Sequence, residues 1–253
     1  MSIQRPKVFW PLTITAGVND KIDGTNGVMA TPFTATLTPG IYYSVDSLLT
    51  EVVAALMAAA PDAWTATVND LTGIVTIANG GTTFEILFST GANAATSVRY
   101  LLGFVPADYD AAFVSVVAPY QHANGWYSPT PFKFDSRNHG EEPNTVITLA
   151  ESGKIKVVRE PELTFRIVDF HFLPAAKTFI ADQVSPTYGH EAIQNWWRDG
   201  AGRFRLWPDA TVEGTSADYA FDSSVLSDGF TPERQFNTRE LYRVGPWKIR
   251  SYV

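Results

Sequence analysis

The residue types that most often perform catalysis or bind metals are few and scattered in this sequence. It contains four histidines, His122, His139, His171 and His190, and no cysteine. The histidine spacing matches neither an HExxH motif nor another local zinc pattern. The lack of cysteine excludes disulfides, thiolate ligands and cysteine nucleophiles. We therefore expect the histidines to lie at the surface or at strand edges with ordinary hydrogen-bond partners.

Two segments resemble ligand-binding loops only in part. Asn79-Gly80-Gly81 is not followed by the Lys-Ser/Thr pair of a phosphate-binding loop. Residues 20–26, Asp-Lys-Ile-Asp-Gly-Thr-Asn, offer oxygen ligands but lack the alternate spacing and the terminal glutamate of an EF-hand. We expect a turn over residues 20–26, with a calcium site as the less favoured alternative.

Paired carboxylates occur at Glu141-Glu142 and at Glu160 and Glu162. Residues 160 and 162 would share one face of a strand. Carboxylate pairs hydrolyse glycosides when a cleft separates their pKa values, but a solvated strand edge explains these pairs more simply. We predict no enzyme, no catalytic residue, no metal and no cofactor, with a glycan hydrolase as the minor alternative.

Aromatic clusters are the strongest signal outside the expected core. They contain Trp126, Tyr127, Trp196, Trp197 and Trp207. Neighbours on a helix lie about 100° apart, so two adjacent tryptophans cannot both face one core. Buried aromatic side chains anchor protein interfaces, and exposed ones can stack on sugars. We predict that these five residues serve the core and a subunit interface, with a sugar platform as the alternative.

The composition indicates a globular chain with extensive packing surfaces. Hydrophobic residues make up 45%, charged residues 18% and aromatic residues 13%, and the net charge is −7. Few charges with many aromatics favour a large core or a surface covered by partners. The negative charge and the lack of a basic run argue against nucleic-acid binding. No apolar run suits a membrane span or a signal peptide, which predicts a non-membrane protein made in the cytoplasm.

The charge balance changes along the chain and suggests two domains. Residues 1–130 hold four cations and nine acids, whereas residues 131–253 hold fifteen and seventeen. A turn-rich segment at 118–140 is the expected linker. We predict a mainly β fold, with β-sandwich domains at 1–125 and 140–253 and a few α-helices.

Local patterns predict the elements. Ser44 begins an amphipathic helix over 44–60, which Pro61 ends. Pro174 would open a helix over 174–184, and another is expected at 190–199. Alternating or apolar runs predict strands at 9–16, 33–38, 64–69, 74–78, 83–88, 113–118, 146–149, 154–158, 162–172, 204–209, 219–225 and 239–253.

The order of parts in the first half resembles a segment common in virion proteins of tailed bacteriophages. That segment has a strand, a Thr-rich strand, a Pro-Gly-x-Tyr turn, an amphipathic helix, a hairpin, a Phe-x-Ile-x-Phe strand and a Leu-Gly-Phe end. Here these parts are Asn19–Ile22, Phe33–Thr38, Pro39–Tyr43, Val45–Ala60, Trp64–Ile77, Phe84–Phe88 and Leu102–Phe104.

Roughly residues 145–253 resemble the β-sandwich of phage distal tail and minor tail proteins. The matching parts are Asn195–Gly200, Arg203–Asp209 and Leu241–Val253. The resemblance implies a structural tail protein of the virion that forms a ring homo-oligomer, expected to be a hexamer. Its partners would be the tail tube protein and the tail-tip, hub or baseplate proteins.

The domain that comes first in this chain departs from the common arrangement of that family. Two alternatives therefore stay open beside the distal tail ring. One is another tail or head-tail adaptor protein. The other is a virion-associated carbohydrate-binding module that recognises host-surface glycans.

Overall fold

The structure is a computed structural model of the 253-residue chain. It describes all residues except 1–2, 5–6, 28–29, 112–113, 128–131, 136–138, 143–144, 150–154, 160–162, 175–189, 200–201, 208–216, 237–238 and 252–253. Within this part the fold is mainly β, as the sequence predicts.

The largest sheet is antiparallel and has ten strands, eight of them in the order β1-β13-β17-β21-β19-β18-β2-β12. In addition, β14 pairs with β17 and β20 pairs with β21. The bounds of these strands are β1 Ile3–Gln4, β2 Lys7–Phe9, β12 Gly125–Tyr127, β13 Phe132–Asp135, β14 His139–Glu142, β17 Leu163–Pro174, β18 Phe204–Trp207, β19 Ala217–Phe221, β20 Glu233–Phe236 and β21 Arg239–Ser251.

The other described strands form four smaller antiparallel sheets, in the orders β10-β9-β4-β5, β11-β8-β7, β3-β6 and β15-β16. Their bounds are β3 Leu12–Ile14, β4 Lys21–Asn26, β5 Thr31–Thr36, β6 Gly40–Tyr42, β7 Trp64–Val68, β8 Ile74–Asn79, β9 Phe84–Leu87, β10 Asp108–Ala111, β11 Ser115–Gln121, β15 Thr145–Leu149 and β16 Ile155–Arg159.

Two predicted helices are confirmed. Helix α1 spans Val45–Ala59, and the Ser44 hydroxyl accepts a hydrogen bond from the Ser47 amide, as an N-cap does. Helix α2 spans His190–Asp199. A short 3-10 helix, η1, spans Ala94–Thr96.

The strand predicted at 219–225 ends at Phe221, and helix α3, Ser223–Ser227, which the sequence did not predict, begins after Asp222. The expected helix over 174–184 does not begin at Pro174, because this residue ends strand β17. The other residues of that expected helix lie outside the described part of the chain. The segment 118–140, expected as the linker, contains the end of β11, all of β12 and β13, and the start of β14.

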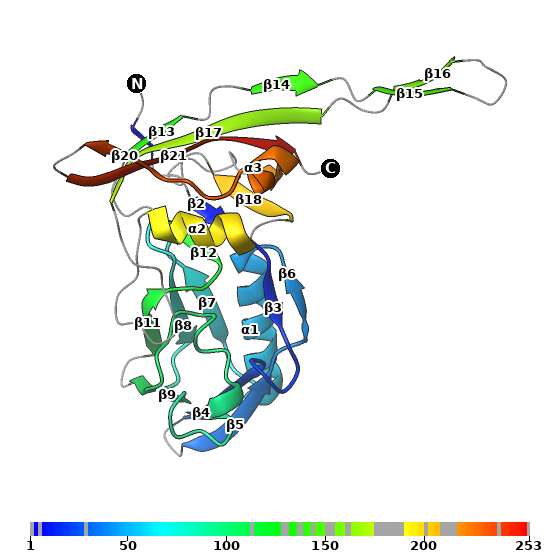
Figure 1. The fold of residues 1–253 in the computed structure, drawn as a ribbon. Helices are drawn as coiled ribbons and strands as arrows, with labels where there is room; N and C mark the ends of the chain where they lie inside the picture. The colour runs from blue at the N-terminus through cyan, green and yellow to red at the C-terminus, as the bar shows by residue number, and fades with distance from the viewer. Residues whose placement is uncertain are drawn as a thin grey trace.

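Two hydrophobic clusters meet at strand β2, which lies between α1 and β17 in Figure 1. One gathers α1 with strands such as β4, β5, β7 and β8, and the other gathers α2 with strands such as β17, β19 and β21. Side chains of successive strand residues point to opposite faces. Phe9 accordingly belongs to the first cluster, whereas Val8 and Trp10 belong to the second.

Strand pairing crosses the predicted boundary between the two domains. From the segment predicted as the first domain, β1 pairs with β13 and β2 pairs with β18. Strand β12 extends the same sheet by pairing with β2. The division into 1–125 and 140–253 stays a prediction, and its two parts share one sheet.

Candidate functional site

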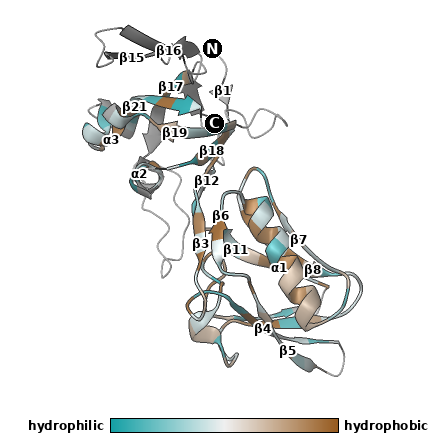
Figure 2. Cartoon of the chain, turned by 90° about the vertical axis from the view of Figure 1, so that its right-hand side faces the viewer, coloured by the Kyte–Doolittle hydropathy of each residue, from teal (hydrophilic) through white to brown (hydrophobic). Residues whose placement is uncertain are grey.

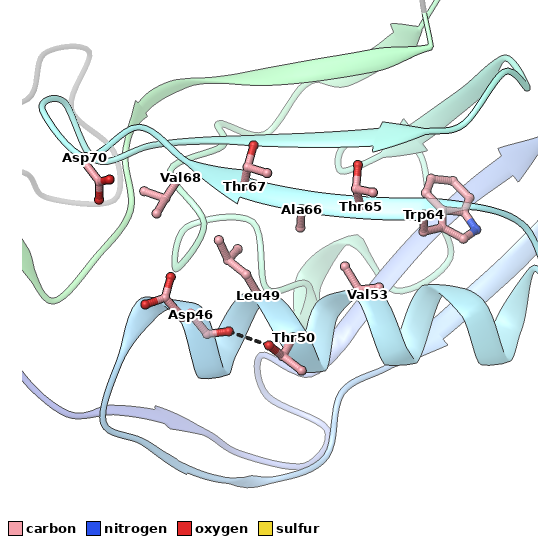
Figure 3. A pocket seen from close by; sticks show the side chains of 10 residues that line it. All are labelled: Asp46, Leu49, Thr50, Val53, Trp64, Thr65, Ala66, Thr67, Val68 and Asp70. Carbon is pink, nitrogen blue, oxygen red and sulfur yellow. Dashed lines mark hydrogen bonds between the residues drawn. The ribbon is translucent and has the colours of Figure 1, made fainter. Parts of the chain in front are cut away.

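A groove of about 600 Å³ opens between helix α1 and strand β7 (Figure 3). Its floor is apolar, and Asp46 and Asp70 lie together at one end while Trp64 lies at the other (Figure 3). The helix contributes Asp46, Leu49, Thr50 and Val53, and the strand with its following turn contributes Trp64, Thr65, Ala66, Thr67, Val68 and Asp70.

The sequence of α1 explains why its side of the groove is partly apolar. Leu49 packs into the core, whereas Val53, one turn further along, is only half-buried. Thr50 and Asp46 are exposed, and the Thr50 hydroxyl donates to the Asp46 carbonyl at 2.8 Å. Helix α1 carries both hydrophobic and hydrophilic residues (Figure 2). Its hydrophobic stripe continues from the buried core to Val53, which lines the groove.

Strand β7 is the last strand of its sheet among the described residues, because it pairs with β8 alone. Asn69 donates its amide to the Ile74 carbonyl, which sets the alternation of the ladder. In an antiparallel pair, every second residue points its backbone groups away from the partner strand. On β7 these residues are Trp64, Ala66 and Val68. The Trp64 amide donates to the Asp62 carbonyl, whereas the amides and carbonyls of Ala66 and Val68 face the open edge.

The groove follows this open edge. Ala66 and Val68 face the core and are half-buried, whereas Thr65 and Thr67 are exposed on the opposite face. Residues of both faces line the groove. The groove therefore runs along the open edge of β7, where an additional strand could pair.

Asp70 links the groove to the large sheet. Its carboxylate accepts a hydrogen bond from the Lys7 ammonium at 2.5 Å. That ammonium also lies 4.5 Å from the ring centroid of Trp207, a cation–π contact. The Lys7 side chain is 9% exposed and that of Asp70 is 62% exposed, so the carboxylate keeps a face open to solvent.

A buried pair, His122 and Tyr127, lies behind this link. Nδ1 of His122 is 2.7 Å from the Ala123 carbonyl, and Nε2 is 2.6 Å from the Tyr127 hydroxyl. A carbonyl only accepts, so Nδ1 carries the proton, Nε2 accepts, and the hydroxyl donates. The expected surface or edge position is therefore wrong for His122, which is fully buried.

Burial also determines how this pair titrates. It lowers the pKa of His122 from 6.5 to about 4; the hydrogen bond to Ala123 opposes this shift and the positive charge of Lys7 adds to it. Burial also raises the pKa of Tyr127 far above its ordinary value, with smaller contributions from the negative charges of Asp70 and Asp46. Both side chains are consequently neutral near pH 7.

Four of the five aromatic residues predicted to serve the core and a subunit interface have described side chains. Trp196 is fully buried and Tyr127 is 2% exposed, so neither ring presents a face to a ligand. Trp197 is half-buried and donates its indole N–H to the Val225 carbonyl at 3.2 Å. Trp207 is half-buried against the first cluster. Trp126 pairs through its backbone with Val8, and its side chain lies outside what the structure describes.

The turn expected over residues 20–26 is wrong, because Lys21–Asn26 is strand β4. Asp23 accepts hydrogen bonds from the Thr34 hydroxyl at 2.7 Å and the Asn93 amide at 2.5 Å. Its carboxylate thus ties three segments together. Among the described residues, no group of three or more His, Asp or Glu side chains could hold a metal ion.

Several candidate polar residues lie where the structure gives no side-chain description. Glu141 and Glu142 belong to strand β14, but only their backbone is described. Glu160 and Glu162 lie outside the described residues. The histidines with undescribed side chains are His139, His171 and His190.

Sequence reasoning did not identify the groove. Asp46 lies in the first turn of α1 and Asp70 in the turn after β7, and their spacing along the sequence does not indicate that they meet. The alternation of Thr65 and Thr67 with Ala66 and Val68 indicated a strand with one exposed face. It could not indicate that the strand lies at a sheet edge, because edge position depends on distant pairing.

No protein-family model matches this sequence. No curated protein matches it at the level required for a significant similarity. Within the described part of the chain, no helix is both long and apolar enough to cross a membrane.

Proposed function

We propose that this chain is a structural subunit of a bacteriophage tail. In this proposal it assembles with its own copies into a ring, expected to be a hexamer, at the distal tail or tail tip. The ring joins the tail tube to the baseplate or tip. The order of sequence parts described above and the mainly β architecture support this function. A closed ring requires two different surfaces on each subunit, one that donates and one that accepts.

The observation that carries the proposal is the hairpin formed by β15 and β16. The two strands pair over five positions, from Thr145 opposite Arg159 to Leu149 opposite Ile155. Neither pairs with any other strand that the structure describes, and Figure 1 shows the hairpin extending beyond β17. A lone two-stranded hairpin is marginally stable, and its outer edges carry unpaired amides and carbonyls. A neighbouring subunit that pairs with an edge would satisfy these groups.

Mass measurement of the purified full chain tests the proposal. Light scattering over a range of concentrations should give one oligomer of defined mass, and negative-stain images should show closed rings. Tails assembled without this chain should bind it at one end, seen by gold labelling. A chain that stays monomeric at every concentration and does not bind such tails overturns the proposal.

A further inference from the structure

We infer that the groove between α1 and β7 is the acceptor for strand β16 of a second copy of this chain. The inference rests on the proposed self-assembly and specifies its contact. Strand β16 would add to the open edge of β7, between that edge and α1. Because donor and acceptor are different surfaces, each copy can give one strand and receive another, as a ring requires.

The backbone of the acceptor suits an added strand. Ala66 and Val68 point their amides and carbonyls to the open edge, so they can form a ladder with a new strand. The two strands are also matched in length, with five residues in β7 and five in β16. The volume of the groove, about 600 Å³, lies in the range of ligand-binding pockets.

The sequence of β16 suits the groove as well. Strand alternation puts Ile155, Val157 and Arg159 on one face. If that face turns to the groove, two β-branched residues lie over its apolar floor and a guanidinium lies at one end. Strands β7 and β16 then run parallel, with Arg159 at the end where Asp46 and Asp70 lie (Figure 3).

Charge complementarity favours β16 over β15 as the donor. Strand β16 carries Lys156 and Arg159, whereas β15, Thr-Val-Ile-Thr-Leu, carries no charge. The acceptor end holds two carboxylates, and Asp70 keeps 62% of its side chain exposed although it contacts Lys7. Asp46 is exposed too. A guanidinium between these carboxylates would gain hydrogen bonds that a neutral residue cannot form.

The test uses one donor variant and its matched control on the same strand. Arg159→Glu places a carboxylate against Asp46 and Asp70 and should convert the oligomer to monomer. Lys156→Glu makes the same charge change on the opposite face of β16 and should leave the oligomer intact. Circular dichroism and thermal unfolding of both variants check that each chain is folded.

An acceptor variant completes the experiment. Ala66→Pro removes an amide that faces the open edge, a position where proline is tolerated, and should also give monomer. A mixture of Ala66→Pro and Arg159→Glu chains retains one intact donor–acceptor pair. Light scattering of the mixture should therefore show a species of twice the monomer mass, and none larger.

The possible results separate this inference from the proposed function. If the unmodified chain forms a ring and the Arg159→Glu and Ala66→Pro variants form it equally well, the groove is not the acceptor. The ring proposal then still stands. Equal loss of assembly in Lys156→Glu and Arg159→Glu would contradict the proposal that the face of β16 with Arg159 turns to the groove. An unmodified chain that is always monomeric overturns both proposals.

Discussion

The Tyr127 hydroxyl donates a 2.6 Å hydrogen bond to Nε2 of His122, a fully buried neutral imidazole. The contact joins strand β12 of the large sheet to the residue that follows β11 of the smaller sheet. It requires Nε2 to be unprotonated, because a protonated imidazole could only donate. Burial lowers the pKa of His122 because it disfavours the charged ring, so the packing between the two sheets is sensitive to the protonation of this residue.

Stability should accordingly fall in mild acid. The folded chain holds the pKa of His122 at about 4, below the 6.5 of an exposed histidine. Between these values the unfolded chain binds a proton that the folded chain does not, so folding weakens as pH falls. The loss from pH 7 to pH 4 is roughly 3 kcal/mol for this residue.

Denaturant unfolding at several pH values measures this effect. The His122→Gln variant keeps a polar side chain but has no titrating group at this position. Its free energy of unfolding should therefore change less with pH between pH 6.5 and 4 than that of the unmodified chain, whatever its value at pH 7. An unchanged slope in this variant would assign the acid sensitivity to other groups.

Gly73 should tolerate no side chain. A Cβ there would lie 2.6 Å from the Tyr127 ring, and its φ of +67° is unfavourable for other residues. We expect Gly73→Ala to cost about 2–4 kcal/mol of unfolding free energy. Gly17→Ala is the matched control, because Gly17 has a φ of +70° but no atom within 4 Å of its Cβ position. It should cost only about 1 kcal/mol, and equal losses in chemical denaturation would refute the contact with Tyr127.

The adjacent tryptophans of α2 should differ in their contribution to stability. Trp196 is fully buried, with its ring centroid 5.0 Å from those of Phe204 and Phe221, whereas Trp197 is half-buried. Trp196→Ala should cost about 3–5 kcal/mol, as for other buried large residues, and Trp197→Ala clearly less. Thermal unfolding monitored by near-UV circular dichroism distinguishes them. Similar losses for both variants would contradict this assignment.

Lys7 and Asp70 should be energetically coupled. Asp70→Asn removes the charge that neutralises a nearly buried ammonium, and we expect a loss of about 1–3 kcal/mol. Lys7→Met keeps most of the side chain without its charge, so the double variant should lose less than the sum of the two single losses. A double-mutant cycle in urea measures this coupling. Additive losses would show that the 2.5 Å contact contributes nothing.

The predicted elements that proved correct depend on neighbours along the chain. Ser44, the apolar spacing after it and Pro61 act within a few residues, and α1 forms where they predict. The hairpin predicted over Trp64–Ile77 forms as strands β7 and β8, and Gly73 between them adopts a positive φ. Local rules suffice for such elements because each hydrogen bond closes a short loop.

The predictions that failed concern residues whose partners are distant in sequence. Pro174 suits the first turn of a helix, yet it ends a strand paired with β21, opposite Leu241. The segment of Asp20 and Asp23 reads as a turn, yet β4 lies between β5 and β9. Pairing on both sides outweighs the weak strand propensity of aspartate and glycine.

The sequence by itself determined a mainly β chain, the main amphipathic helix and the scarcity of residues for catalysis. Only the tertiary structure decided that Val8 and Phe9 enter different cores, that Trp196 is buried, and that β7 has an open edge beside α1. The reason is that a local pattern specifies which side of a strand is apolar. Which partner lies at its edge, and whether a partner lies there at all, depends on segments far away in the sequence.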